Sequence, residues 1–251
     1  MKKEKTWHED DSFWETVNDV MFTRNRMDIT PAEIDRVLNI LGVEENAHIL
    51  DLCCGVGRHS IELARRGYKI TGIDRTRSYL DRAKQSAMEE NLTNIEFIEA
   101  DMRTFCSPDT FDAVINLYTS FGYFEDPEDD KRVLQNIHKS LRAGGNLLLE
   151  MMGKEVLARI FQRTRWHEEE DGTLILQESR VCEGFSWIEN RWIIIKGGKR
   201  ADFRVDHRLY SAKELTTLIT ECGFMGFEVY GDLERSPYDE KAKRLIVVAW
   251  K

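Results

Sequence analysis

The stretch His48–Ala64, HILDLCCGVGRHSIELA, decides the fold of this chain. It opens with an apolar run typical of a buried strand, passes through a loop with two glycines, and ends in a segment with helical spacing of apolar residues. Backbone N–H groups at the start of a helix favour negative or polar ligand groups, and glycine lets a ligand approach the chain closely. The stretch therefore predicts a strand–loop–helix unit that binds a cofactor.

Several kinds of site compete for this loop. A phosphate-binding Walker loop needs a lysine near the start of the helix, and none is present. A dinucleotide fingerprint needs a third glycine where Ser60 stands, so it is the poorer match. A metal site is not expected, because no two of the five cysteines have C-x-x-C spacing. A tight turn that binds no ligand remains as the last alternative.

The composition is that of an ordinary globular protein, with 41% hydrophobic and 32% charged residues among 251. No apolar run approaches the roughly 20 residues of a membrane-spanning helix, and no apolar core follows the first lysines as in a signal peptide. We therefore expect a cytoplasmic protein with no membrane partner. The net charge of −9 and the lack of a long basic block make a nucleic-acid partner unlikely.

Strands and helices alternate along most of the chain, which predicts a doubly wound, mostly parallel α/β sheet. The expected strands span residues 48–53, 68–73, 95–99, 111–117, 146–151, 224–230 and 245–250. The expected helices span residues 12–22, 58–66, 77–90 and 126–142, with two more beginning at capping boxes at Thr30–Glu33 and Ser211–Glu214.

The alternation stops between about residues 166 and 210, where strand-like runs at 173–182, 185–195 and 201–210 are separated by glycines. This pattern predicts a small antiparallel β insertion. We divide the chain into an N-terminal segment (1–30), an α/β domain (31–162 and 211–251), and the insertion (163–210).

The loop sequence LDLCCGVGRHS resembles the first motif of class I S-adenosylmethionine-dependent methyltransferases, commonly D-L-G-C-G-x-G. Asp51, Cys54, Gly55 and Gly57 match, whereas Cys53 stands where the family more often has glycine. The similarity extends roughly from residue 31 to 151, with the last helix and strands in register. It implies a seven-stranded Rossmann-like sheet, with S-adenosylmethionine as cofactor and S-adenosylhomocysteine as product.

Three further matches follow at the ends of successive strands. The resemblance implies that Asp74 in GID accepts hydrogen bonds from the ribose, that Asp101 in IEADMRTF accepts one from the adenine amine, and that Met102 covers the adenine ring. In INLYTSFGYF, carbonyls near Asn116 and Leu117 would hold the methionine amine. The expected cofactor-binding residues are Asp51, Cys53, Gly55, Gly57, Asp74, Arg75, Asp101, Met102, Asn116 and Leu117.

Methyl transfer depends mainly on orientation of the reactants, so no catalytic triad is required. Because inserted strands often form the acceptor pocket in small-molecule members of the family that this chain resembles, we expect the insertion to form a lid over the acceptor. We also expect the N-terminal segment to cover the cofactor. If a base assists, His207 is the first candidate, followed by Tyr118 and Tyr210. From the N-terminal segment, we expect Trp14, Met21 and Phe22 over the cofactor, with Arg24 or Arg26 near its carboxylate.

The leading hypothesis is a methyltransferase that acts on a small-molecule acceptor. The alternatives are an RNA or protein methyltransferase, a nicotinamide dehydrogenase, and an S-adenosylmethionine-binding protein without turnover. The base-amine motifs N-P-P-Y and D-P-P-Y and the Pro-Cys pair of cytosine methyltransferases are absent. The sequence predicts neither the methylated atom nor the oligomeric state.

Overall fold

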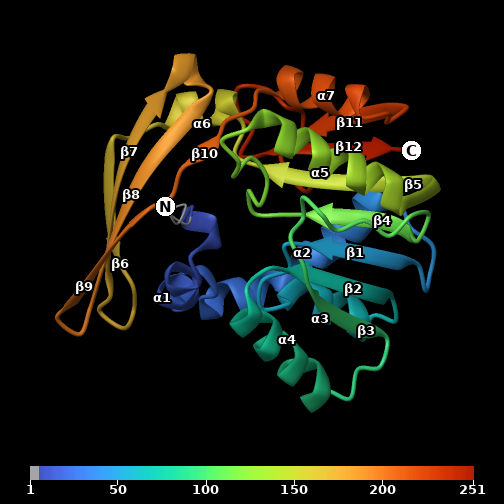
Figure 1. Ribbon diagram of the computed structural model, residues 1–251, viewed down its shortest axis with the longest axis horizontal. Coiled ribbons are helices and arrows are strands. Elements are labelled where there is room, and N and C mark those ends of the chain that lie inside the picture. The colour runs from blue at the N-terminus through green and yellow to red at the C-terminus, as the bar shows by residue number, and fades with distance from the viewer. Residues whose placement is uncertain (1–5) are drawn as a thin grey trace, which may run out of the picture.

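The computed structural model describes residues 6–251 and contains two β-sheets (Figure 1). The larger sheet has seven strands in the order β11-β12-β5-β4-β1-β2-β3. Its strands are β1 (His48–Leu52), β2 (Lys69–Asp74), β3 (Ile95–Glu99), β4 (Phe111–Asn116), β5 (Leu141–Met151), β11 (Gly226–Tyr230) and β12 (Leu245–Trp250). The first five run parallel and β12 runs antiparallel to both of its neighbours, which confirms the predicted Rossmann-like sheet.

Helices cover both faces of this sheet, which is why its central strand β1 is buried along its whole length. The helices are α1 (Asp11–Met21), α2 (Arg24–Leu41), α3 (Arg58–Arg65), α4 (Arg77–Glu89), α5 (Pro127–Ser140), α6 (Lys154–Ile160) and α7 (Ala212–Glu221). Apolar side chains of α5 and α7 form one core with the sheet, and those of α2 and α3 form the core on the other face. The capping box predicted at Ser211 and Glu214 is confirmed at the start of α7.

The start of α2 was predicted wrongly. The helix begins at Arg24, with Thr23 as its N-cap, and continues through Pro31. Thr30 does not cap a helix; its hydroxyl donates to the carbonyl oxygen of Arg26 one turn earlier, at 2.8 Å. Arg58 also donates to that carbonyl, at 3.2 Å. Pro31 lies inside the helix, where it has no backbone N–H to donate. The local sequence alone places it at the start of a helix.

The smaller sheet is antiparallel, as predicted for the insertion. It consists of β6 (Thr164–Glu168), β7 (Leu174–Cys182), β8 (Trp187–Lys196), β9 (Lys199–Arg204) and β10 (His207–Arg208), with the 3-10 turn η2 (Glu183–Phe185) between β7 and β8. Strand β8 pairs with β7 along one edge and with β9 and β10 along the other. Strand β6 and helix α6 were not predicted; every residue of β6 is exposed, so no alternation marks it.

The N-terminal elements η1 (Trp7–Glu9) and α1 lie between the two sheets (Figure 1). Phe13 and Val17 of α1 pack with Ile194 of β8 in one apolar cluster. The rings of Phe13 and Phe203 make an edge contact at 5.2 Å between centroids. Helix α1 is therefore attached to the antiparallel sheet, while its other side faces the carboxyl ends of the parallel strands. Within the described residues, no helix is long and apolar enough to span a membrane.

Candidate functional site

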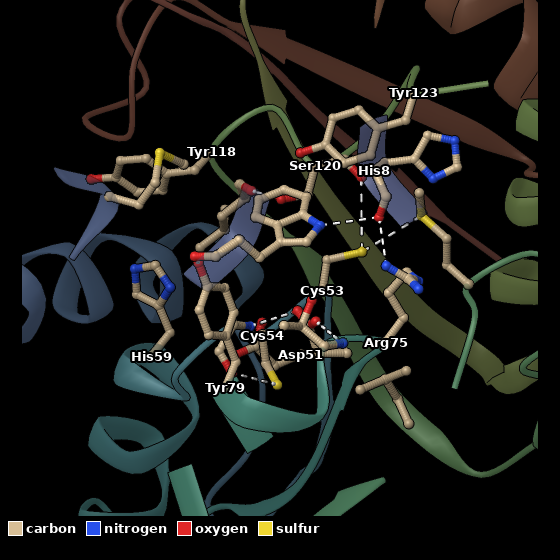
Figure 2. A pocket seen from close by; sticks show the side chains of 18 of the residues that line it. His8, Asp51, Cys53, Cys54, His59, Arg75, Tyr79, Tyr118, Ser120 and Tyr123 are labelled. Atoms are coloured by element: carbon tan, nitrogen blue, oxygen red, sulfur yellow. Dashed lines mark hydrogen bonds between the residues drawn. The ribbon is translucent and has the colours of Figure 1, made fainter. Parts of the chain in front are cut away.

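A cavity lies where the loops after β1, β2, β3 and β4 meet the N-terminal segment (Figure 2). This is the edge at which open α/β sheets bind ligands. The residues that line it are His8, Trp14, Met21, Phe22, Arg26, Asp51, Cys53, Cys54, Gly55, Arg58, His59, Ile73, Asp74, Arg75, Thr76, Tyr79, Ala100, Asp101, Met102, Leu117, Tyr118, Ser120, Tyr123 and Phe124. The cavity therefore has a sheet-loop wall and a wall from the N-terminal segment.

The loop between β1 and α3 has a left-handed backbone at three positions: Cys53 has φ +65°, Gly55 +58° and Gly57 +76°. A Cβ atom on Gly55 would stand 2.8 Å from the ring of Phe22. A Cβ on Gly57 would stand 2.8 Å from the ring of Phe97. These two glycines are thus required both by backbone conformation and by close packing. Cys53 adopts the conformation that glycine adopts more easily, at the position where the sequence departs from the family motif.

Ser60 stands where a dinucleotide fingerprint has its third glycine, and its side chain contacts Asp51. The Ser60 hydroxyl donates to an Asp51 carboxylate oxygen at 2.5 Å, and both side chains are buried. Burial raises the pKa of Asp51, and the hydrogen bond from Ser60 works against that rise. Ser60 therefore joins the first turn of α3 to the end of β1.

Asp74 closes the same loop from the end of β2. One of its carboxylate oxygens accepts from the backbone N–H of Gly55 at 2.9 Å, and the other accepts from that of Thr76 at 2.8 Å. Burial raises the pKa of Asp74 above its usual value. Each carboxylate oxygen has a second lone pair, so the group can still accept hydrogen bonds from a ligand with two hydroxyls.

Asp101 is held by its neighbour Arg103. The Arg103 guanidinium donates to both carboxylate oxygens, at 2.5 to 3.0 Å, and also to Glu9 of the N-terminal segment at 3.0 Å. Burial acts to raise the pKa of Asp101, but the hydrogen bonds from Arg103 outweigh it, so the pKa falls. Beside it, the sulfur of Met102 is 3.6 Å from the sulfur of Cys53. This end of the cavity offers an ionised acceptor next to an apolar surface.

The opposite end carries positive charge. Arg58 donates to Glu33 at 2.5 Å, and its guanidinium lies 4.5 Å from the centre of the Tyr118 ring. His59 Nε2 lies 3.2 Å from the same oxygen of Glu33, and the Tyr118 hydroxyl donates to the other oxygen. Burial opposes ionisation of Glu33, but these hydrogen bonds lower its pKa to about 2. Figure 2 shows Tyr118 and His59 at this end and Arg75 at the other.

Arg26 is the cation at this end that has a free charge. Its guanidinium donates to the carbonyl of Met21 at 2.7 Å, and no carboxylate of the described residues pairs with it. The side chain lines the cavity, whereas Arg24 is 94% exposed on the outside of α2. Of the two arginines proposed from the sequence, the structure thus places only Arg26 where it can contact a ligand carboxylate.

The N-terminal segment is held over the cavity by polar contacts. Arg75 donates to the carbonyls of His8 and Glu9, at 2.7 and 3.1 Å. Tyr79 donates to the carbonyl of Trp14 at 2.5 Å. The guanidinium of Arg75, expected to touch the cofactor, is therefore used largely to hold this segment in place.

The structure brings most of the predicted site residues together. Asp51, Cys53, Gly55, Asp74, Arg75, Asp101, Met102, Leu117 and Tyr118 all line the cavity, as do Trp14, Met21 and Phe22. Gly57 does not line it but is the N-cap of α3. Asn116 lies behind the wall, where its amide donates to the carbonyl of Leu52 at 3.0 Å.

His207 and Tyr210 lie outside the cavity. His207 pairs with the buried Ile188 across β10 and β8, and burial lowers its pKa to about 4. Tyr210 is buried in the core, where its hydroxyl donates to Asp130 at 2.8 Å. Neither side chain reaches the cavity, so neither is placed to take a proton from a molecule bound there.

The sequence did not predict several of the residues that line the cavity, among them Arg58, His59, His8 and Tyr79. His8 lies in a polar stretch, and Tyr79 lies on the apolar side of α4, so neither has a local signal that distinguishes it from surface or core residues. Within residues 6–251, no group of three or more histidine, cysteine or acidic side chains is arranged to hold a metal ion.

Comparison with known proteins identifies a methyltransferase domain in part of the chain. Residues 49–145 match the family described as the methyltransferase domain. A putative methyltransferase, YqeM of Bacillus subtilis (strain 168), is 28% identical over 212 residues, which are 82% of this chain and 85% of that protein. The 23S rRNA (uracil(1939)-C(5))-methyltransferase RlmD of Alkalilimnicola ehrlichii is 33% identical, but over only 32% of this chain and 18% of its own.

Among solved structures, CalS10 of Micromonospora echinaspora has a TM-score of 0.64 at 20% identity, and the similarity covers 95% of this chain and 96% of that one. It is described as an amino pentose methyltransferase with SAM bound. The strand order, the loop geometry and the domain match agree with one another. Residues 49–145 therefore match a methyltransferase domain, and the fold of the chain is that of the class I S-adenosylmethionine-dependent methyltransferases.

Proposed function

We propose that this protein transfers the methyl group of S-adenosylmethionine to a small-molecule acceptor. The observation that carries the proposal is the polarity of the cavity, which has Asp74 and Asp101 at one end and Arg26 at the other. S-adenosylmethionine presents ribose hydroxyls and an adenine amine at one end and a carboxylate at the other. Hydrogen-bond acceptors and a cation separated in this way suit it better than NAD, whose central groups are phosphates.

The residues of this chain would act mainly by binding and orientation. Asp74 would accept from the ribose hydroxyls and Asp101 from the adenine amine, while Arg26 would pair with the carboxylate. The bound cofactor supplies an activated methyl group. Trp14, Met21 and Phe22 would exclude water from it, because they come from the segment that covers the cavity.

A small acceptor is favoured over RNA by the shape and charge of the site. The cavity lies beneath η1 and α1, and the chain has a pI near 5.3. Recognition of a phosphate backbone depends on basic residues around the site. The rRNA methyltransferase matches only about a third of this chain, whereas the amino pentose methyltransferase matches it almost throughout. RNA or protein methylation is the alternative, and cofactor binding without turnover is a second.

The proposal is tested by release of S-adenosylhomocysteine. The protein is incubated with S-adenosylmethionine and, in separate reactions, a panel of small amines and alcohols, total RNA, and a peptide mixture. We expect release above background with a small molecule. Release only with RNA or peptides would replace the proposal by the first alternative, and cofactor binding with no release from any acceptor would support the second.

A further inference from the structure

A second groove lies between the antiparallel sheet and the N-terminal segment. Only two of the residues that line the groove also line the cofactor cavity. The groove is lined by Thr6, Trp7, His8, Asp10, Phe13, Tyr123, Glu125, Cys182, Glu183, Trp187, Glu189, Asp202, Phe203, Arg204, Asp206 and Arg208. Its walls thus come from η1 and α1, from the loop after β4, and from β7 to β10.

The groove adjoins the cofactor cavity at His8 and Tyr123, since both residues line both spaces. Their rings are stacked, 6.2 Å apart with an interplanar angle of 25°. Figure 2 shows the two side chains next to each other at the upper edge of the cavity. The groove and the cofactor cavity therefore meet at these two side chains.

The apolar part of the groove is aromatic and well fixed. The indole of Trp7 makes an edge contact with the ring of Tyr123 at 4.8 Å and donates to the carbonyl of Asp206 at 2.7 Å. Phe13 and Phe203 make a further edge contact. On the opposite side, the guanidinium of Arg208 lies over the ring of Trp187 at 5.5 Å. These flat surfaces suit a small molecule with an apolar body.

The charged part of the groove is predominantly acidic. Its carboxylates are Asp10, Glu125, Glu183, Glu189, Asp202 and Asp206, against the guanidinium groups of Arg204 and Arg208. Both arginines already have acidic partners: Arg204 pairs with Asp206 at 3.2 Å, and Arg208 with the buried Asp130 at 3.4 Å.

Three carboxylates in the lining have no ion-pair partner among residues 6–251, and one of them, Asp10, accepts hydrogen bonds from Ser12. The other two are Glu125, after β4, and Glu183, in the turn between β7 and β8. They approach the groove from the α/β domain and from the antiparallel sheet, respectively. A cation in the groove would therefore meet acidic groups from both sides, whereas an anion would be repelled by both.

We propose that this groove is the acceptor site and that the acceptor is a small molecule with a cationic amine and an apolar body. The inference rests on the function proposed above and adds the class of acceptor to it. Once the ammonium has lost a proton to solvent, the nitrogen lone pair forms the new bond to the methyl carbon. The bond between that carbon and sulfur breaks, sulfur keeps the electron pair, and the methylated nitrogen loses or keeps its proton according to its basicity.

The test uses three probes with the same indole-ethyl body that end in an ammonium, a hydroxyl or a carboxylate group. Tryptamine, tryptophol and indole-3-propionate are titrated calorimetrically into the protein saturated with S-adenosylhomocysteine, so that no turnover occurs. We expect tryptamine to bind at least about fivefold more tightly than tryptophol, and indole-3-propionate to bind most weakly. The double variant Glu125→Gln/Glu183→Gln should lose most of this preference. Glu170→Gln, at an exposed acid in the turn after β6, is the control and should keep it.

The outcomes separate the two proposals. If S-adenosylhomocysteine binds but the amine and the alcohol bind equally, or if the double variant keeps the amine preference, the amine assignment is wrong while the proposed function stands. If S-adenosylhomocysteine does not bind at all, both proposals fall. Unchanged affinity of the double variant for S-adenosylhomocysteine would show that the two glutamates act in the groove and not through the cofactor cavity.

Discussion

Replacement of Asp74 by alanine tests the assignment of the ribose-binding group. The carboxylate would lose its hydrogen bonds to the cofactor, and a hydrogen bond to a charged group contributes roughly 1.5–3 kcal/mol. We therefore expect the dissociation constant for S-adenosylhomocysteine to rise by roughly 10- to 150-fold. Isothermal titration calorimetry on the wild type and the variant gives this ratio directly.

The structure also predicts how the fold responds to Asp74→Ala. The variant leaves the backbone N–H groups of Gly55 and Thr76 without their acceptor, which is destabilising. It also removes a carboxylate whose pKa is raised by burial, which is stabilising at neutral pH. Because these effects oppose each other, we expect the variant to remain folded in a urea titration.

The control for this comparison is Asp109→Asn, because Asp109 has a left-handed backbone (φ +48°) that asparagine tolerates more readily than alanine. Asp109 is 72% exposed and pairs with Lys251 at 2.8 Å, away from the cavity lining. Loss of its charge should change neither cofactor affinity nor the fold to a measurable extent, because exposed ion pairs contribute little. A dissociation constant for Asp74→Ala equal to that of the control would refute the role given to Asp74.

Three further predictions follow from the polar groups around the cavity and the core. Arg26→Ala should weaken S-adenosylhomocysteine about tenfold but leave adenosine, which has no carboxylate, unchanged in calorimetry; equal loss for both ligands would contradict the assignment. Arg75→Ala should speed cofactor release in stopped-flow measurements, because it frees the carbonyls of His8 and Glu9, while Arg77→Ala, 67% exposed, should not. Burial raises the pKa of Asp130 to about 7 against hydrogen bonds from Tyr210 and the charge of Arg208. The folded state then holds a proton that the unfolded state releases near pH 4, so this contribution to stability is present at low pH and is lost as the pH rises to about 7. Between about pH 5 and about pH 8, the free energy of unfolding of wild type should fall relative to Asp130→Asn, by up to roughly 3 kcal/mol in urea titrations; parallel pH profiles would contradict it.

The fold and the sheet-loop wall of the site were predictable because their signals are local. Each predicted residue of this wall stands at the carboxyl end of a predicted strand. This holds for the glycines after β1, for the acid at the end of β2 and for the acid after β3. Gly55, Asp74 and Asp101 line the cavity, and their roles toward the cofactor are predictions.

The remaining features depend on contacts between residues far apart in the chain. Arg75 directs its guanidinium to residues 8 and 9 because the N-terminal segment lies across it, which no local pattern encodes. Helix α2 passes through Pro31 although the capping-box pattern predicts a start there. His8 enters the site because η1 is packed between two sheets. Each of these depends on tertiary packing, which overrides local propensity.

The central claim is that the cavity is built for S-adenosylmethionine, and calorimetry of the wild-type protein with S-adenosylhomocysteine and with NAD tests it most directly. We expect saturable binding of S-adenosylhomocysteine at one site per chain and no measurable heat from NAD. Saturable binding of NAD with no response to S-adenosylhomocysteine would contradict it.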